Sequence, residues 1–263
     1  MNTDSETINN AWNEQLSREF IDYGRFFVPY REEQIEVIIN LLPQSDEPIH
    51  VVELCCGEGL LAEAILDAYT SIRVIGFDGS KEMLAKAKKR LKRFGRRFKP
   101  IKFDLADSTW RGLKQPADMV VSSLAIHHLD GKGKTALFKD VYKMLNPGGC
   151  FIVADIIDPA HPRSKALAAK AYDQFVKEKS IALEGDMRAF DFFQNEGWNI
   201  FHYLDPDDID KPSPIIDQLN WLVKAGFEMV DVFWFFAGHA IFGGWKSESC
   251  RTSKVSDVSA KIG

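Results

Sequence analysis

The sequence predicts an α/β fold built on a doubly wound, largely parallel sheet. Short apolar runs alternate with amphipathic helical patterns from Ile49 to Asp158. These apolar runs are continuous, which is typical of strands buried on both faces of a sheet. Two later apolar runs are joined tightly through Ala237 and Gly238, a spacing that favours an antiparallel pair. We therefore expect parallel strands with right-handed crossovers, closed by an antiparallel hairpin.

The length and composition fit one domain with insertions. The chain has 263 residues, a net charge of −5, an apolar fraction of 45% and a charged fraction of 27%, so it can bury a sizeable core. We predict a single domain over residues 1–246, with helices in 1–45 and an inserted cap at 159–214, followed by a polar tail at 247–263. The mild acidity disfavours a dedicated nucleic-acid binder.

Cysteine usage and the N-terminus bear on location and metal binding. No CxxC spacing occurs among Cys55, Cys56, Cys150 and Cys250, so we predict no metal site. Reduced thiols in a cytoplasmic protein are the simpler interpretation. The polar N-terminus shows no secretory signal, and no apolar run approaches the ~20 residues that span a bilayer, so we expect no membrane partner. The oligomeric state is not encoded in any feature of the sequence.

Each expected element follows from its local pattern. Residues 11–42 predict two helices, and Pro43 ends the second. Continuous apolar runs predict the strands, and helical spacing of apolar residues predicts the helices between them. In chain order these patterns give a strand at 49–55, a helix at 60–69, a strand at 72–78, a helix at 80–94, strands at 100–107 and 117–129, a helix at 134–145 and a strand at 149–157. Ser80 is expected to cap the second of these helices.

The pattern changes after Asp158. Residues 159–214 have a helical pattern at first and then an irregular one. They include the aromatic residues Phe190, Phe192, Phe193, Trp198, Phe201 and Tyr203. A helix at 215–227 and strands at 228–236 and 239–246 follow. The aromatic segment predicts an insertion that packs its own small core and contributes to a pocket wall.

A glycine turn follows the first strand. The segment "GEGLLA", from Gly57 to Ala62, fits G-x-G-x-x-A and precedes Asp78 at the end of the next strand. Glycine lets cofactor atoms approach the main chain, and an acid at that place can accept both hydroxyls of a ribose. The candidate cofactors are NAD and S-adenosylmethionine. Glu53, inside the first strand, would repel a pyrophosphate but suits a cofactor with an ammonium and a sulfonium cation.

The segment "VVELCCGEGLLAEAIL", from Val51 to Leu66, resembles motif I of the class I S-adenosylmethionine-dependent methyltransferases, with Cys55 in place of the first glycine. The segments "VIGFDGSKEML", "FDLAD", "SSLAIHHL" and "MLNPGGCFIVAD" are similar to later motifs of that family, in the same order. The resemblance covers residues 49–158 and 215–246. It implies a Rossmann-like sheet of seven strands. It also implies methyl transfer to a small-molecule acceptor, with S-adenosylmethionine as the cofactor.

The resemblance further implies a set of cofactor ligands. Asp78 is carried over as the ribose ligand, and Asp104 and Leu105 as the adenine-binding turn. By analogy with the family, Tyr23 or Arg25 of the N-terminal helix is expected to reach the carboxylate of the cofactor. The expected cofactor site comprises Tyr23, Arg25, Glu53, Cys55, Gly57, Gly59, Asp78, Gly79, Met83, Asp104, Leu105, Ser122 and Leu124.

Proton handling is the second role that the site residues must fill. Methyl transfer is an in-line displacement, and a base is needed only if the acceptor must lose a proton. His127 and His128 end the expected fourth strand, and because alternate side chains point to opposite faces, one of the two is expected to reach the site. The candidates for proton handling are His128, Asp155, His202 and His239. Packing or hydrogen bonding is the alternative role for each of them.

Other functions stay open at this point. Residues 178–183, "EKSIAL", resemble a stretch of the carboxy-S-adenosylmethionine synthases of tRNA modification, although the sequence does not place the arginine that the extra carboxylate needs. A NAD-dependent oxidoreductase is supported by the G-x-G-x-x-A match alone. A non-catalytic protein of the same fold is disfavoured by the intact Gly57, Gly59 and Asp78. The basic run at 86–99 allows RNA binding, but its apolar residues favour an amphipathic helix with a solvated face.

Overall fold

The computed structural model describes residues 12–43, 47–107, 109–112, 115–203 and 209–248. Most of the expected polar tail, Cys250 and the first eleven residues therefore lie outside the described part of the chain. Within the described residues, no helix combines the length and apolar character that crossing a bilayer requires.

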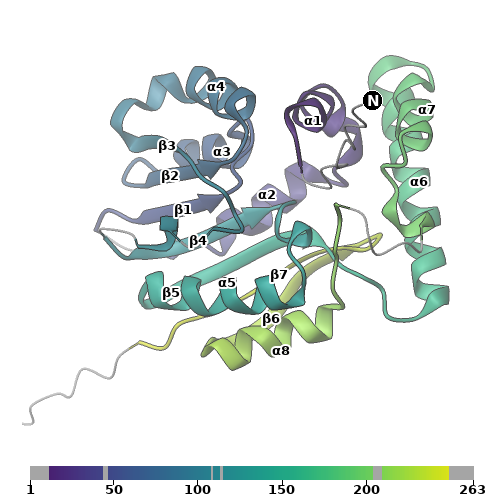
Figure 1. The fold of residues 1–263 in the computed structure, drawn as a ribbon. Coiled ribbons are helices and arrows are strands. Elements are labelled where there is room, and N and C mark those ends of the chain that lie inside the picture. Colours follow the sequence, from purple (N-terminus) through teal and green to yellow (C-terminus); the bar gives the residue numbers. More distant parts are fainter. Residues whose placement is uncertain (1–11, 44–46, 108, 113–114, 204–208, 249–263) are drawn as a thin grey trace, which may run out of the picture.

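The centre of the fold is a seven-stranded sheet of order β3-β2-β1-β4-β5-β7-β6. Its strands are β1 (His50–Leu54), β2 (Arg73–Asp78), β3 (Phe98–Lys102), β4 (Ala117–Ser123), β5 (Leu145–Ile156), β6 (Glu228–Phe236) and β7 (His239–Trp245). The first five strands pair in parallel, and β7 pairs antiparallel with both β5 and β6 (Figure 1). The doubly wound sheet with a closing antiparallel hairpin is thus confirmed.

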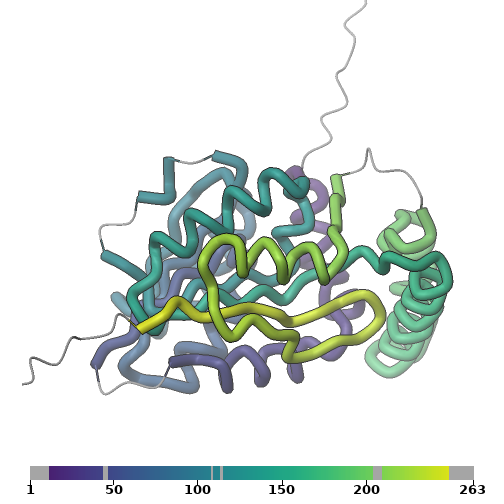
Figure 2. Tube along the Cα trace, turned by 90° about the horizontal axis from the view of Figure 1, so that it is seen from below, coloured from purple at the N-terminus to yellow at the C-terminus, as the bar shows by residue number. Residues whose placement is uncertain are grey.

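Helices cover both faces of the sheet. On one face, α2 (Arg31–Asn40), α3 (Leu60–Ala68) and α4 (Lys81–Arg90) pack against buried side chains of β1, β2, β4 and β5. On the other face, α5 (Gly131–Met144) and α8 (Ile215–Ala225) lie side by side (Figure 2) and pack against the alternate residues of the same strands. Because both faces are covered, the central strands β1, β2 and β4 are largely apolar and buried, which is the pattern that predicted them.

A third apolar cluster lies beside the sheet. It joins α1 (Glu14–Phe27) to α6 (Pro162–Glu184), α7 (Arg188–Asn195) and the short helix η4 (Ile200–His202). Figure 1 shows α6 and α7 standing as a separate layer on the side where the parallel strands end, with α1 between them and α4. Of the aromatic residues predicted to form a small core, five are in this cluster, including the fully buried Phe193, whereas Tyr203 is exposed.

Two differences from the expected elements affect the site. The expected strand at 117–129 ends at Ser123, and η3 (Ile126–His128) follows as a turn of 3₁₀ helix. The expected helix at 80–94 ends as α4 at Arg90 and continues as the 3₁₀ helix η1 (Leu91–Arg97), where Gly95 has a φ of 56°. A third short helix, η2 (Thr109–Arg111), precedes β4.

The basic run on α4 and η1 has partners on α3. Arg90 pairs with Glu58 and Glu63, and Arg93 pairs with Glu63 and Asp67. Arg97 donates to three main-chain carbonyls at the end of α3. These three arginines therefore tie α4 and η1 to α3, which favours a structural role for the arginines of this run.

Candidate functional site

A cavity of about 910 Å³ opens where β1, β2 and β4 end. Open α/β sheets bind ligands at this edge because adjacent strands connect in opposite directions there. The walls come from the turns after these three strands, from α1 and α2, and from α6 with the segment around Trp198. The parallel sheet and the helices packed beside it, α1 and α6, therefore contribute to one cavity.

The turn after β1 brings main chain to the cavity. Cys55, Gly57 and Gly59 have φ values of 55°, 53° and 84°. The amide of Cys56 donates to the carbonyl of Phe77 at 2.8 Å, which ties the turn to β2. Cys55 lines the cavity in a left-handed conformation that costs a non-glycine residue roughly 1–2 kcal/mol, so the turn carries strain at the candidate site.

The two glycines of the turn have different surroundings, which predicts different effects of alanine. A Cβ at Gly57 would have Met83 Sδ, 3.9 Å away, as its nearest neighbour, whereas a Cβ at Gly59 would meet Leu91 Cδ1 at 2.8 Å. We expect Gly57→Ala to lose roughly 1–2 kcal/mol of stability from its positive φ and to obstruct a ligand in the cavity. We expect Gly59→Ala to lose more stability because a packing clash is added. Thermal melts measure the stability losses, and ligand titrations measure the obstruction of the cavity. Equal stability losses in the two variants would contradict the different surroundings assigned to Gly57 and Gly59.

Asp78 is held at the end of β2 by two main-chain amides. Its Oδ2 accepts from Gly57 N–H and its Oδ1 from Ser80 N–H, both at 2.8 Å. Burial raises the pKa of Asp78, and the Ser80 and Gly57 amides oppose that shift. The carboxylate lines the cavity and keeps unused lone pairs, so it can accept further hydroxyl donors. Ser80 caps α4 as expected, with its Oγ accepting from Met83 N–H.

Glu53 is a buried carboxyl at the base of the cavity. It is 2% exposed, and its Oε2 is out of contact with solvent and has no hydrogen-bond partner among the described residues. Burial, with the nearby Asp78 carboxylate as a smaller cause, raises the pKa of Glu53 to about 8. An unpartnered buried carboxyl oxygen that faces a cavity is suited to a cationic ligand, because such a ligand would supply the missing partner.

The remaining expected cofactor ligands divide into two groups. Gly79, Met83, Asp104, Leu105 and Leu124 line the cavity. Gly59 and Ser122 are not among the described residues that line it. Ser122 is turned into the sheet, where its Oγ donates to the carbonyl of Leu54 at 3.1 Å.

An arginine at the start of α2, and not one of α1, lies at the cavity. Tyr23 stacks on Phe192 at 4.1 Å and Arg25 pairs with Glu184 at the surface, and neither is among the described residues that line the cavity. Arg31, at the start of α2, lines it instead. The guanidinium of Arg31 donates to the carbonyl of Gly24, and burial lowers its pKa against the opposing charge of Glu58. Of Tyr23, Arg25 and Arg31, Arg31 is the residue that lines the cavity.

His127 is fixed between two carboxylates. Its Nδ1 lies 2.5 Å from Asp155 Oδ1, its main-chain N–H donates to Asp155 Oδ2, and its Nε2 lies 3.3 Å from Asp210 Oδ1. Burial opposes a charge on His127, but the two carboxylates outweigh it and raise the pKa of His127 to about 10. Asp155 is buried behind His127 and does not itself line the cavity, so it acts on the site through the imidazole.

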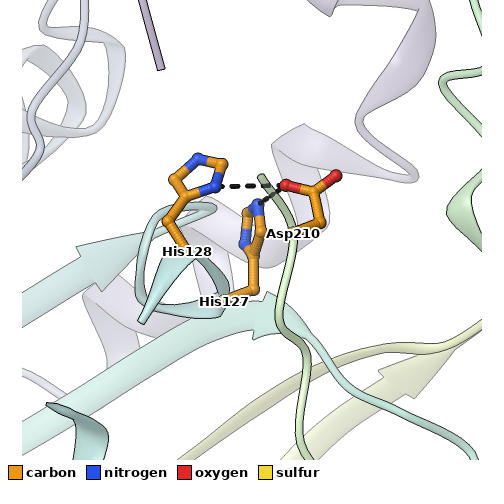
Figure 3. A group of neighbouring side chains, drawn as sticks. All are labelled: His127, His128 and Asp210. Carbon is orange, nitrogen blue, oxygen red and sulfur yellow. Dashed lines mark ion pairs between the residues drawn. The ribbon is translucent and has the colours of Figure 1, made fainter. Parts of the chain in front are cut away.

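His128 lies beside His127 and faces the same carboxylate. Its Nδ1 is 3.1 Å from Asp210 Oδ1, so both rings approach one oxygen atom (Figure 3). Burial lowers the pKa of His128, and the neighbouring His127 adds to that shift. Both histidines line the cavity, contrary to the expectation that one would. The alternation rule fails because they lie on η3 and not on a strand.

The other two histidines differ in placement. His239 lines the cavity, and its Nδ1 lies 3.1 Å from the carbonyl of Ala237. Burial lowers the pKa of His239 to about 4. His202 is half exposed, pairs with Asp173 at 2.8 Å and is not among the described lining residues. Of the predicted proton-handling groups, the structure brings His128 and His239 to the cavity and Asp155 directly behind it.

Sequence reasoning missed three residues of this site. Arg31, Tyr172 and Asp210 line the cavity together with the predicted residues. Asp210 lies in the segment "DPDDID", whose acidic residues give no sign of which one faces a distant histidine pair. Tyr172 is on α6, where helical spacing indicates a buried face but not that this face borders a cavity.

Comparison with known proteins agrees with this geometry. A family model described as a methyltransferase domain matches residues 51–149. The trans-aconitate 2-methyltransferase of Acidovorax sp. (strain JS42) is 30% identical over 152 residues, which are 57% of this chain and 55% of that protein. The demethylmenaquinone methyltransferase of Leptospira interrogans serogroup Icterohaemorrhagiae serovar copenhageni is 27% identical over 206 residues, 78% of this chain and 77% of that protein. The match thus spans about half the length of the trans-aconitate enzyme.

The fold also resembles solved structures. The structure of an O-methyltransferase family protein from Burkholderia thailandensis superposes with a TM-score of 0.63 at 15% identity, over 90% of this chain and 61% of that one. At this identity the likeness concerns the fold.

Proposed function

Because the chain belongs to the class I S-adenosylmethionine-dependent methyltransferases, we propose that it transfers a methyl group from S-adenosylmethionine to a small-molecule acceptor. The observation that carries the proposal is the pair of carboxyl groups at the cavity edge: Asp78 at the end of β2 and the unpartnered Glu53 within β1. Asp78 suits the hydroxyls of a ribose, and Glu53 suits a cationic group. S-adenosylmethionine has a ribose and cationic groups, and it also carries an activated methyl group.

The residues around the glycine turn fit that cofactor. Asp78 would accept the ribose hydroxyls, and the open space at Gly57 would let the ligand touch the main chain. Asp104 and Leu105, in the segment after β3, line the cavity, and an adenine would lie against them. Glu53 would hold the ammonium and face the sulfonium, because its buried oxygen has no other partner among the described residues.

Arg31 is the arginine that we assign to the carboxylate of the cofactor. It lines the cavity beside α1 and interacts electrostatically with Glu58 of the glycine turn. We expect Arg31→Ala to weaken S-adenosylmethionine binding by about 1.5–3 kcal/mol, the range for hydrogen bonds to charged groups. Arg25→Ala is the matched control, since Arg25 pairs with Glu184 at the surface, and it should bind the cofactor like the unchanged protein. Calorimetric titration that ranked the two variants in the opposite order would reject the assignment.

The acceptor would lie between η3 and the inserted cap at residues 159–214. Tyr172, Trp198 and Ile200 of that segment line the cavity, and Trp198 also contacts Phe20 and Phe27 of α1. Aromatic walls exclude water from the cavity. In the displacement step the sulfur of the cofactor loses its positive charge, and a site without water favours that step. His127 and His128 lie at this end, where they would orient the acceptor.

A cytoplasmic location is part of the same proposal. Cys55, Cys56 and Cys150 are free thiols, and burial raises the pKa of each of them. Unpaired cysteines are the usual condition of proteins in a reducing compartment.

Calorimetry with S-adenosylmethionine, S-adenosylhomocysteine and NAD tests the proposal. We expect binding of the first two at one site per chain and none of NAD in titrations at pH 9, where Glu53 is ionised and would face the pyrophosphate of NAD. Binding of NAD alone would favour the oxidoreductase alternative. The carboxy-S-adenosylmethionine alternative needs an arginine for an extra carboxylate, and native mass spectrometry of the ligand retained on purification would separate it from methyl transfer.

A further inference from the structure

We propose that His127, His128 and Asp210 bind a divalent first-row transition-metal ion at the acceptor end of the cavity. The candidate ligand atoms are one ring nitrogen from each histidine and one carboxylate oxygen, and they all lie within 4.8 Å of one another. Figure 3 shows the two rings and the carboxylate converging on a common region from η3 and from the segment before α8. The three residues line the cavity, so a bound ion would face the space where we place the acceptor.

The separations between the ligand atoms suit a tetrahedral ion. His127 Nε2 lies 3.3 Å and His128 Nδ1 lies 3.1 Å from Asp210 Oδ1. Zinc bonds of ~2.0–2.1 Å to nitrogen and oxygen place neighbouring tetrahedral ligands roughly 3.3 Å apart. Charge-assisted hydrogen bonds between the same groups are usually shorter, at ~2.7–2.9 Å. The two N···O separations are therefore compatible with an ion bound between the groups.

The ring nitrogen of His128 gives a second, independent indication. Nδ1 of His128 is out of contact with solvent and makes no hydrogen bond within the described part of the chain, although a carboxylate oxygen is 3.1 Å away. The His128 ring is thus close to Asp210, but its orientation does not suit a hydrogen bond from Nδ1 to the carboxylate. Buried polar atoms in proteins nearly always have a partner, and an ion would provide one here.

Asp155 supplies the outer support that histidine ligands of metals usually have. It contacts Nδ1 of His127 at 2.5 Å, and its oxygens also accept the main-chain amides of His127 and Ile156. With Nδ1–H held by that carboxylate, Nε2 is the ring nitrogen that faces Asp210, and it would bind the ion in place of its proton. Such carboxylate–histidine pairs orient ligands and raise their basicity at metal sites.

Hydrogen bonds hold the segment that contains Asp210 next to the two histidines. The amide of Lys211 donates to the carbonyl of His127 at 2.7 Å, which joins the residue after Asp210 directly to η3. The ammonium of the buried Lys134 donates to the carbonyl of Lys211 and, at 2.8 Å, to Ser213 Oγ. These bonds fix both sides of the candidate site without a metal, so the site is formed in advance.

Three protein ligands leave a position open toward the cavity, which is typical of metal ions that bind a substrate. If the proposed function holds, on which this step rests, the ion selects acceptors that present an oxygen. The ion would stabilise the oxygen anion formed when the hydroxyl proton passes to water. The oxygen lone pair would then form the bond to the methyl carbon as the carbon–sulfur bond breaks, and that electron pair would remain on sulfur.

Cobalt titration tests the site without an activity assay. Untagged protein freed of metal with a chelator is titrated with Co²⁺ and followed by visible absorption. We expect one ion per chain with the intense bands of four-coordinate cobalt. Asp155→Asn should weaken the affinity about 10- to 100-fold and Asp210→Asn at least as much. Asp173→Asn is the matched control, because Asp173 pairs with His202 outside the cavity, and it should bind cobalt unchanged.

Either of two results would overturn the inference: no stoichiometric cobalt binding, or equal binding by the unchanged protein and Asp210→Asn. If circular dichroism shows that Asp210→Asn is unfolded, His128→Gln is used in its place. Cobalt binding by His128→Gln equal to that of the unchanged protein would then overturn the inference. Titration of S-adenosylmethionine in the presence of chelator keeps the two proposals apart, since Glu53 and Asp78 do not depend on the ion. Cofactor binding without cobalt binding refutes the metal site alone, and the reverse refutes the cofactor assignment alone.

Discussion

Replacing Asp78 with alanine is expected to weaken S-adenosylmethionine binding by about 1.5–3 kcal/mol, roughly tenfold to a hundredfold. The variant loses the proposed acceptor of the ribose hydroxyls and also the acceptor of the Gly57 and Ser80 amides. Its melting temperature should therefore fall as well, because those amides are left without a partner. Calorimetry for affinity and thermal melts for stability measure the two effects separately.

Two further variants make the Asp78 result specific. Asp78→Asn keeps an oxygen that can accept one amide, so it should be more stable than the alanine variant while still binding the cofactor weakly. Asp67→Ala removes a carboxylate that pairs with Arg93 at the surface and should leave affinity unchanged. A folded Asp78→Ala protein with unchanged affinity would refute the role of Asp78.

The second large effect concerns Glu53 and the pH dependence of stability. Its pKa is raised from an ordinary value near 4.5 to about 8 in the folded protein. Between these values the folded protein holds a proton that the unfolded chain has lost, so stability falls as pH rises, by up to about 1.4 kcal/mol per pH unit. Glu53→Gln removes this term. Its unfolding free energy should exceed that of the unchanged protein at pH 8 and depend less on pH between 5 and 8.

Cofactor binding should reverse the protonation of Glu53. A cation beside the carboxyl favours its charged form, so binding near pH 7 should release up to one proton and become tighter as pH rises toward 8. Calorimetry in two buffers of different ionisation enthalpy counts the released protons. Glu53→Gln should abolish the release, whereas Glu63→Gln, a change on α3 where Glu63 pairs with Arg90, should not. Identical proton release by Glu53→Gln and the unchanged protein would contradict the assignment.

The parts of the site that were predictable from sequence are those encoded within a few residues of each other. The turn through Gly57 and Gly59, and Asp78 one strand later, follow from periodicity and from the need of a left-handed backbone. Cys55 also has a positive φ, which explains why motif I of the methyltransferase family has glycine at that place. The doubly wound parallel sheet could be predicted because continuous apolar strands alternating with helices permit few arrangements.

The missed residues depend on how separate elements are placed in space. The sequence suggested Arg25, but α1 ends at Phe27 and a turn through Tyr30, with a φ of 47°, sends α2 in a new direction with Arg31 toward the cavity. A helical pattern does not specify the angle of such a turn. Asp210 reaches His128 only because the segment before α8 is bonded to η3. No local pattern of the sequence encodes that contact.

The structure of the complex with S-adenosylhomocysteine is the most direct measurement of the central claim. We predict that both ribose hydroxyls lie within hydrogen-bond distance of the Asp78 carboxylate and that the amino group of the ligand contacts Glu53. The thioether should then point toward His127 and His128. A nucleoside bound anywhere other than at the end of β2 would contradict the account.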